Sequence, residues 1–242
     1  MSFSFKKRFG QNFLINKNVI YKIVQAIPER FSHVYEIGPG GGALTALLLK
    51  KFDHVTAIEI DRDCIEQLQI KFAEHDNLKL INADILQQDL TAECIIGNLP
   101  YNIGTKIIEK LLYKPIECGV FMLQREVAQR ISGNDYGRFS ICVAARYDVS
   151  NVINVHPKDF NPRPKVESQV IKLTKHDRYA NVDMRILNDI TKIVFQYPRK
   201  KITWLKKEHL DLANKLEQLG VDFNLRPENI PQEIFFRDLF YK

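Results

Sequence analysis

The sequence lacks several features that mark whole classes of protein. It has only four cysteines, Cys64, Cys94, Cys118 and Cys142, and none of them forms a C-x-x-C pair or a cluster with histidine. A disulfide framework and a zinc site are therefore not expected, and we predict no metal. The longest apolar runs are far shorter than the ~18 residues that a membrane span requires. Residues 1–13 are basic and aromatic, without the apolar core of a secretory signal, so we expect a cytoplasmic protein.

Positive charge is present in excess. The chain has 35 Lys and Arg against 29 Asp and Glu, a net charge of +6, and 45% of its residues are hydrophobic. This composition is that of a globular protein and excludes a disordered or collagen-like chain. The net charge favours an anionic partner such as nucleic acid, although charge alone leaves a basic protein without such a partner equally open.

Short β-rich runs alternate with helical stretches between residues 33 and 124. Strands are predicted over 33–38, 55–60, 78–82, 94–98 and 119–123, and helices over 42–52, 62–74 and 103–113. Parallel strands need crossover connections, which are usually helices. The alternation therefore predicts an α/β fold in which helices cover both faces of a mostly parallel sheet.

The pattern changes after residue 124. We predict a helix over 125–131, strands over 149–156 and 167–173, helices over 183–196, 209–219 and 231–241, and either a helix or a strand over 139–147. Residues 160–165 are predicted to form a loop because their prolines cannot join a ladder. Gly220 is expected to cap the helix before it, and Pro198 to end or kink the helix that begins at 183.

Two domains are expected from this organisation. A chain of 242 residues allows one large domain with a small second one, at roughly 100–200 residues per domain. We place the α/β domain at residues 1–176 and a small, all-helical domain at residues 177–242.

The densest signal is a glycine-rich turn between the first predicted strand and helix, Glu36-Ile-Gly-Pro-Gly-Gly-Gly-Ala43. Gly38 and Gly40 let the backbone approach a ligand and take dihedral angles that a Cβ forbids. Glu59 closes the second strand, where a carboxylate can accept hydrogen bonds from both hydroxyls of a ribose. Strand, glycine turn, helix, strand and terminal carboxylate in this order predict a Rossmann-like site for a nucleoside cofactor.

Two cofactor classes fit this turn. The pattern Gly38-x-Gly40-x-x-Ala43 matches the fingerprint of dinucleotide-binding enzymes. Glu36 favours S-adenosylmethionine instead, because methyltransferases often carry an acid there that faces the methionine part. Asp84 ends the third strand, where it can accept from the exocyclic amine of adenine; a helix N-cap is its alternative role. Both acids lie at carboxyl ends of strands, where ligands bind in such sheets.

The fourth predicted strand ends in Gly97-Asn-Leu-Pro-Tyr-Asn102, the pattern of methyltransferases that act on a planar amino nitrogen. Such a nitrogen is a poor nucleophile because its lone pair is delocalised into the ring. The Asn98 side-chain oxygen and the Leu99 carbonyl can accept hydrogen bonds from the two N–H groups of this nitrogen as it becomes tetrahedral. Pro100 stiffens the turn, and Tyr101 can stack on the base. The alternative is a simple β-turn.

Seven motifs, taken in order, resemble one enzyme family. They are KRFGQNFL at 7–14, EIGPG at 36–40, IEID at 58–61, GNLPYN at 97–102, FMLQREV at 121–127, YGR at 136–138 and FNPRPKV at 160–166. Together they resemble the ribosomal RNA adenine N6-dimethyltransferases of the bacterial KsgA type. The resemblance implies dimethylation of two adjacent adenosines in the loop near the 3′ end of small-subunit (16S) rRNA. It also implies a 30S precursor as partner, and we expect a monomer.

The resemblance assigns roles to residues of this chain. S-adenosylmethionine, which leaves as S-adenosylhomocysteine, would be held by Asn12, Leu14, Glu36, Gly38, Gly40, Glu59, Ile60, Asp84, Ile85 and Asn98. The catalytic set would be Asn98, Leu99, Pro100, Tyr101 and Phe160. Phe160 would stack on the flipped adenine opposite Tyr101, which fits the energetics of base flipping. Its alternative role is to anchor its loop in the core.

Basic residues near aromatic ones are expected to contact RNA phosphates. They are Lys7, Arg8, Arg163, Lys165, Arg199, Lys200 and Lys201. Such runs usually form a solvated face, but Tyr197 and Trp204 nearby favour an RNA-facing role.

The chain departs from the family in two places and leaves two alternatives open. The segment between Asp84 and Asn98 is short, and Tyr197-Pro-Arg-Lys200 replaces an arginine-rich helical stretch. These departures concern docking more than catalysis. An Erm-type methyltransferase of large-subunit rRNA, which gives macrolide resistance, shares the fold and the Asn-x-Pro-Tyr motif. A non-catalytic RNA-binding relative is the second alternative.

Overall fold

The computed structural model describes residues 12–101, 103–114, 116–133 and 136–241. The chain forms two compact units, Met1–Ala128 with Val149–Lys175, and Gln129–Asp148 with His176–Lys242. The end of the first unit at Lys175 falls beside the division expected from the sequence. Residues 129–148, which the sequence analysis placed in the α/β domain, belong to the second unit by their contacts. The assignment of domains 1–176 and 177–242 as functional parts stays a prediction.

A seven-stranded sheet dominates the first unit. Its order is β4-β3-β2-β5-β6-β9-β7, and every pair from β4 to β6 is parallel, whereas β9 runs antiparallel to β6. The strands are β2 (His33–Ile37), β3 (His54–Glu59), β4 (Leu78–Asn82), β5 (Cys94–Asn98), β6 (Cys118–Gln124), β7 (Tyr147–Val155) and β9 (Ser168–Lys175). The predicted α/β fold with a mostly parallel sheet is confirmed.

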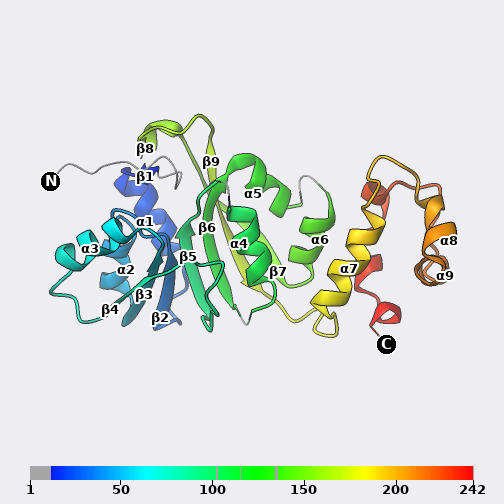
Figure 1. The fold of residues 1–242 in the computed structure, drawn as a ribbon, viewed down its shortest axis with the longest axis horizontal. Helices are drawn as coiled ribbons and strands as arrows, with labels where there is room; N and C mark the ends of the chain where they lie inside the picture. Colours follow the sequence, from blue (N-terminus) through cyan, green and yellow to red (C-terminus); the bar gives the residue numbers. More distant parts are fainter. Residues whose placement is uncertain (1–11, 102, 115, 134–135, 242) are drawn as a thin grey trace. The chain divides into compact units, whose positions relative to one another are not determined.

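Helices cover this sheet in the manner of α/β proteins. Figure 1 shows α1 (Lys17–Gln25), α2 (Thr45–Lys51) and α3 (Arg62–Lys71) on one side of the sheet and α4 (Gly104–Leu111) on the other. β5 and β6 are buried along nearly their whole length. Strands that are covered on both faces need apolar side chains on both faces, which explains their unbroken apolar sequence.

A second, two-stranded sheet corrects one sequence-based prediction. β1 (Phe13–Leu14) pairs antiparallel with β8 (Phe160–Asn161), and Figure 1 shows them side by side. Residues 160–165 were predicted to form a loop because of their prolines. Phe160 and Asn161 precede the first of these prolines and keep their N–H groups, so they can pair.

The second unit is built from short helices. The ambiguous segment 139–147 is mostly helical, as α6 (Arg138–Ala144), and α5 (Arg125–Ile131) lies at the transition between the units. The other helices are α7 (Met184–Val194), α8 (Leu205–Glu208) and α9 (Leu210–Gln218). α7 ends before Pro198, as expected. Gly220 follows α9 with φ of +75°, the left-handed conformation of a helix C-cap.

The predicted helix over 231–241 is wrong. The chain forms only two short 3₁₀ turns there, Gln232–Phe236 and Asp238–Phe240. Two further 3₁₀ turns, Ile202–Trp204 and Pro227–Asn229, lie earlier in the unit, and a fifth, Pro157–Asp159, lies in the first unit. These turns bury Phe235, Phe236 and Phe240. In an α-helix the three side chains would lie within one arc of about 140°, so their apolar spacing suits a helix and does not reveal the tighter 3₁₀ turns.

The four cysteines are buried, and none of them forms a disulfide. Among the residues that the structure describes, no helix is long and apolar enough to cross a membrane. Nor does the described part of the chain hold three or more His, Cys, Asp or Glu side chains grouped to bind a metal ion.

Candidate active site

The candidate site lies where four parallel strands end. β2, β3, β4 and β5 end at Ile37, Glu59, Asn82 and Asn98. Because these strands are parallel and in register, their carboxyl ends meet at one edge of the sheet. Ligands bind at this edge in open α/β sheets.

The glycine turn after β2 has a backbone that a side chain would obstruct. Gly38 and Gly40 have φ of +66° and +52°, in the left-handed region that favours glycine. The N–H of Gly38 donates to the carbonyl of Ile58 at 2.9 Å, which fixes the turn to β3. A Cβ on Gly40 would lie 2.7 Å from Cε1 of Phe13. The phenyl ring of Phe13 therefore packs directly on the turn.

Glu59 is held by two backbone donors. Its Oε2 accepts from the N–H of Gly40 at 3.1 Å and its Oε1 from the N–H of Asp61 at 2.9 Å. Burial raises the pKa of Glu59 above its usual value, and the two N–H groups oppose that rise. Each oxygen keeps further acceptor capacity. Glu59 is therefore a rigidly placed acceptor of the kind that a ribose diol requires.

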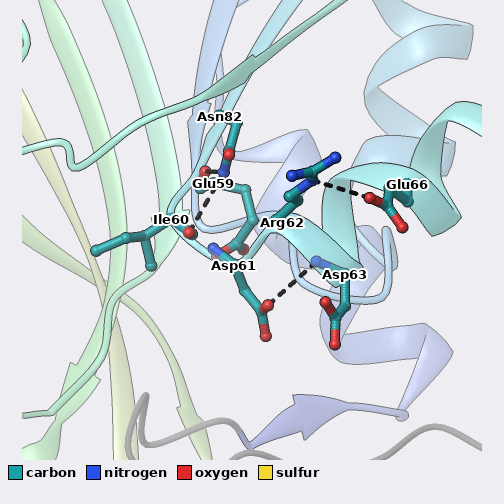
Figure 2. A network of polar contacts seen from close by, with 7 residues as sticks. All are labelled: Glu59, Ile60, Asp61, Arg62, Asp63, Glu66 and Asn82. Carbon is teal, nitrogen blue, oxygen red and sulfur yellow. Dashed lines mark hydrogen bonds and ion pairs between the residues drawn. The ribbon is translucent and has the colours of Figure 1, made fainter.

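Figure 2 shows how the end of β3 is held to β4. The side-chain amide of Asn82 donates to the carbonyls of Glu59 at 2.9 Å and Ile60 at 3.3 Å. The Ile60 side chain points away from this polar network and is 50% exposed. The network thus presents an apolar side chain next to the carboxylate of Glu59.

Glu36 is the most buried carboxylate of the site. It is 1% exposed, and its Oε2 accepts from the hydroxyl of Thr45 on α2 at 2.6 Å. Burial raises the pKa of Glu36 to about 7, with a further rise from Glu59 and an opposing effect of the Thr45 hydrogen bond and the Lys71 ammonium. A carboxyl group with such a pKa changes its charge near neutrality.

Asp84 lies in a turn after β4. Its Oδ1 accepts from the N–H of Leu86 at 2.9 Å, but residues 85–87 form a turn and no helix, so the expected helix N-cap is not formed. The contact with adenine stays a prediction. The residue also lines the cavity described below. Ile85, next to it, is buried and lines the same wall.

A cavity of about 410 Å³ joins these groups. Every residue predicted to hold the cofactor lines it: Asn12, Leu14, Glu36, Gly38, Gly40, Glu59, Ile60, Asp84, Ile85 and Asn98. Cavities of this size hold small organic ligands. A nucleoside fits the residues present, because apolar Ile60 and Ile85 suit the faces of a base and Glu59 suits a ribose.

The turn after β5 forms part of the cavity wall. Asn98, Leu99, Pro100 and Tyr101 all line the cavity. Nδ2 of Asn98 donates to the carbonyl of Asn12 at 3.1 Å, so the amide nitrogen is used by the protein and Oδ1 is the acceptor left for a ligand. The N–H of Leu99 donates to Met122 at 3.0 Å, which fixes the turn to β6.

Tyr101 is oriented by its hydroxyl. That hydroxyl lies 2.6 Å from the hydroxyl of Ser168 on β9, and burial raises the pKa of Tyr101. The tyrosine therefore stays neutral at physiological pH, and its ring is held at the cavity. This arrangement suits stacking rather than proton transfer.

Phe160 does not line the cavity. It is 2% exposed, packs in the hydrophobic core and is not among the described residues that line the cavity. What the structure shows is the anchoring role given above as its alternative. Stacking on a base would require this ring to leave the core, so that role stays a prediction.

The basic candidates divide into three groups. Lys7 and Arg8 lie outside the described residues. Arg163 and Lys165 are exposed in the segment after β8, and Arg199, Lys200 and Lys201 are exposed in the second unit. Nζ of Lys200 lies 4.5 Å from the ring centre of Tyr197, and the rings of Tyr197 and Trp204 are 4.9 Å apart. Basic side chains and aromatic rings thus lie close together here, as the sequence suggested; a role in RNA binding stays a prediction.

Sequence reasoning gave no site role to three residues that shape the cavity. Phe13 lines it over the glycine turn, and Lys71 lines it while its ammonium donates to the carbonyl of Gly41 at 2.7 Å. Thr45 holds Glu36. The sequence could have pointed to Phe13 as a site residue, because it lies in the first of the quoted motifs. No local signal marks Lys71 or Thr45, since their contacts form only in the folded chain.

The fold separates the two cofactor classes left open. The sheet is parallel from β4 to β6 with β9 added antiparallel, and Glu59, Asp84 and Asn98 line one cavity at its strand ends. This combination fits the S-adenosylmethionine-dependent methyltransferases.

Comparison with known proteins gives the family. A model described as ribosomal RNA adenine dimethylase matches residues 2–236, and the chain belongs to this family. It is 38% identical over 248 residues to the ribosomal RNA small subunit methyltransferase A of Pseudomonas putida, covering 96% of this chain and 92% of that protein. The protein of the same name from Legionella pneumophila is 40% identical over 244 residues, covering 95% and 94%.

Two solved structures share the fold over nearly the whole chain. A dimethyladenosine transferase from Plasmodium falciparum has a TM-score of 0.81 at 25% identity, with 92% of this chain and 94% of that chain covered. The 23S rRNA methyltransferase ErmE has a TM-score of 0.68 at 26% identity, with 95% and 98% covered. The chain is therefore an S-adenosylmethionine-dependent methyltransferase of the ribosomal RNA adenine dimethylase family.

Proposed function

We propose that this enzyme dimethylates N6 of two adjacent adenosines in the loop near the 3′ end of small-subunit (16S) rRNA. The observation that carries the proposal is the Asn98 turn in the cavity wall, where Nδ2 donates to the carbonyl of Asn12 and Oδ1 is left as an acceptor. The named relatives support the choice of small-subunit rRNA. We further propose that the partner is a 30S precursor in the cytoplasm, that methylation accompanies its maturation, and that the enzyme acts as a monomer.

Each residue of the Asn98 turn has a proposed role in the reaction. When bound, S-adenosylmethionine supplies a methyl group on a sulfonium sulfur. Oδ1 of Asn98 and the carbonyl of Leu99 accept hydrogen bonds from the two N–H groups of the adenine amino group and favour its tetrahedral form. Such preorganised acceptors act mainly in the transition state. Tyr101 stacks on the base, which is worth about 1–3 kcal/mol.

The cofactor is held by the groups at the ends of the strands. Glu59 accepts from the ribose, Ile60 and Ile85 cover the faces of the cofactor's adenine, and Asp84 accepts from its amino group. Gly38 and Gly40 keep the backbone of the turn close to the ligand. Asn12, Leu14 and Glu36 complete the proposed cofactor site around the methionine part.

RNA is proposed to bind along exposed cations. Arg163 and Lys165 lie in the segment that follows β8, and Arg199, Lys200 and Lys201 lie in the second unit. We propose that the second unit serves RNA docking. Lys7 and Arg8 belong to the same proposed set from their positions in the sequence.

A methylation assay tests the proposal. The protein is incubated with labelled S-adenosylmethionine and, in parallel, with unmodified small subunits, naked small-subunit rRNA and large-subunit rRNA, and the modified bases are mapped. Two dimethylated neighbours near the 3′ end of 16S rRNA are expected. A modified adenine in large-subunit rRNA would favour the Erm-type alternative, which the shared fold of ErmE keeps open. Absence of any methylation would favour a non-catalytic RNA-binding relative.

A further inference from the structure

Residues 12–16 lie between the cofactor cavity and the segment around β8. On the cavity side, the carbonyl of Asn12 accepts from Asn98 at 3.1 Å, and the ring of Phe13 packs on the glycine turn. Asn12, Phe13 and Leu14 all line the cavity. A ligand that fills the cavity therefore meets this stretch of backbone directly.

The other side of residues 12–16 is bonded to the segment 159–161. Phe13 and Leu14 pair with Asn161 and Phe160 in the β1–β8 ladder (Figure 1). The ladder continues beyond β1, because the N–H of Ile15 donates to the carbonyl of Asp159 at 2.8 Å. Residues 12–14 thus line the cavity on one side, and residues 13–15 are hydrogen-bonded to segment 159–161 on the other.

A hydrogen bond between the side chains of Asn16 and Asp159 adds to these backbone contacts. Nδ2 of Asn16 donates to Oδ1 of Asp159 at 2.7 Å, and Oδ2 of Asp159 accepts from the N–H of His156 at 3.0 Å. Asp159 is 7% exposed, so its carboxylate has lost most of its water. A hydrogen bond to a charged, shielded group is stronger than a neutral one and costly to lose.

Both polar atoms of the Asn16 side-chain amide form hydrogen bonds. While Nδ2 binds Asp159, Oδ1 accepts from the N–H of Asn18 at 3.0 Å and of Val19 at 3.3 Å, as the N-cap of α1. The helix start is therefore joined to the segment before β8 by one side chain.

We propose that Asn16 and Asp159 are positioning residues that make cofactor binding and the ordering of segment 156–166 a single, coupled event. This inference rests on the proposed function, in which Arg163 and Lys165 of that segment face the RNA. A ligand that orders residues 12–16 also orders the segment bonded to them, so the second ligand loses less conformational entropy on binding. Coupling of this kind is reciprocal: RNA raises the affinity for the cofactor by the same factor.

The bond can be broken and rebuilt without removing the helix cap. In Asn16→Asp the new carboxylate still caps α1, since Asp is a good N-cap, but it faces the carboxylate of Asp159. Adding Asp159→Asn restores a hydrogen bond of reversed direction, because the amide nitrogen at position 159 donates to position 16 while its oxygen accepts from His156. Asn18→Asp, at an exposed site two residues away, adds the same charge without touching Asp159 and is the matched control.

Hydrogen exchange tests the coupling without RNA. Exchange of the backbone amides in 156–166 is measured with and without saturating S-adenosylhomocysteine. We expect the ligand to slow exchange there by at least about fivefold in the natural protein. The same slowing is expected in Asn18→Asp and in the double variant, but not in Asn16→Asp. Equal protection in Asn16→Asp, no protection in the natural protein, or no recovery in the double variant would overturn the proposal.

The affinity for S-adenosylhomocysteine, measured with and without unmodified small-subunit rRNA, gives the second readout. The ratio of the two affinities should be at least about fivefold in the natural protein and close to one in Asn16→Asp. If RNA is neither bound nor methylated, the proposed function fails while the exchange experiment still decides the coupling. If RNA is methylated and the ratio is the same in Asn16→Asp, the coupling through Asn16 is wrong. Should Asn16→Asp not fold, Asn16→Ser keeps a cap, removes the amide donor and carries the same expectations.

Discussion

The cofactor cavity and the basic stretch 197–207 of the second unit hold their polar groups in opposite ways. In the cavity, Glu36 and Glu59 are 1% and 7% exposed and have fixed protein donors. In the basic stretch, Arg199 and Lys200 are exposed side chains on long, flexible stems. Groups fixed in a shielded site act through geometry, whereas exposed cations act on a polyanion through the number of charges.

This contrast has a consequence for how variants behave. A substitution in the cavity should change one specific step by a large factor, since its partners cannot rearrange. A substitution in the basic stretch should change binding in small, graded amounts.

Asn98→Ala should have the largest effect. It removes the acceptor Oδ1, whose interaction is stronger in the transition state than in the bound substrate, so the loss should fall on turnover. Single-turnover methyl transfer at saturating cofactor and RNA should fall by on the order of 10²–10³. RNA affinity should hardly change, because phosphate contacts dominate it.

Two controls sharpen that experiment. The cofactor affinity of Asn98→Ala must be measured by calorimetry, because Asn98 also lines the cofactor cavity. Tyr101→Phe keeps the ring and loses only the hydroxyl contact with Ser168, so its rate should fall by less than about tenfold, the cost of one neutral hydrogen bond. Near-normal transfer by Asn98→Ala would show that the turn is merely structural.

Glu36→Gln should change the pH dependence of stability. The unfolded chain releases the carboxyl proton near pH 4.5, whereas the folded chain holds it to about pH 7 because Glu36 has a raised pKa. The natural protein should therefore lose stability as pH rises through this window, by on the order of 3 kcal/mol at most. The amide keeps an oxygen for Thr45 and has no proton to release, so the variant should lack this loss.

The measurement for Glu36 is urea unfolding of both proteins at pH 5, 6, 7 and 8. The difference between them isolates the carboxyl group from all others that titrate. The variant should be relatively most stable at pH 8. A constant difference across the series would mean that Glu36 titrates at its ordinary pKa.

Glu59→Ala should weaken S-adenosylmethionine binding by about 1.5–3 kcal/mol, the scale of hydrogen bonds to a charged group. Glu59→Gln should also weaken it, because each carboxylate oxygen accepts an N–H and an amide nitrogen would face one of these donors. Glu66→Ala is the matched control: it removes an exposed carboxylate paired with Arg62 (Figure 2) and should leave the affinity nearly unchanged. Calorimetry decides, and an unaltered affinity in Glu59→Ala would contradict the ribose assignment.

Neutralising Arg199, Lys200 and Lys201 to glutamine should have the smallest effect on chemistry. RNA affinity should fall and the slope of its logarithm against the logarithm of salt concentration should flatten by about 2–3, if all three meet phosphates. Cofactor affinity should not move. The control removes three exposed lysines elsewhere, Lys50, Lys79 and Lys192. If both triple variants keep the full salt slope, the basic stretch is a solvated face.

Local signals were enough for much of the fold. β4, β5 and α5 have the bounds that periodicity predicted, because their apolar pattern and their flanking residues agree. The failures are segments where the pattern conflicts with packing. Residues 231–241 show a helical sequence pattern, but they form short 3₁₀ turns that bury their phenylalanines, and the apolar spacing fits both structures. The sequence pattern of residues 139–147 fitted both a helix and a strand, and it contains no signal that distinguishes the two.

The sequence by itself determined which residues meet in the candidate cofactor cavity, because that cavity lies at strand ends. A glycine turn and the residues Glu59, Asp84 and Asn98 each follow a recognisable strand, and parallel pairing brings such ends to one edge whatever the rest of the chain does. Only the tertiary structure decided what lies around them. Asn16 and Asp159 are 143 residues apart in sequence, and Thr45 meets Glu36 across a helix and a strand. Phe160 lies in the core rather than the cavity for the same reason: contacts between distant segments depend on how the whole chain packs, and no local pattern records them.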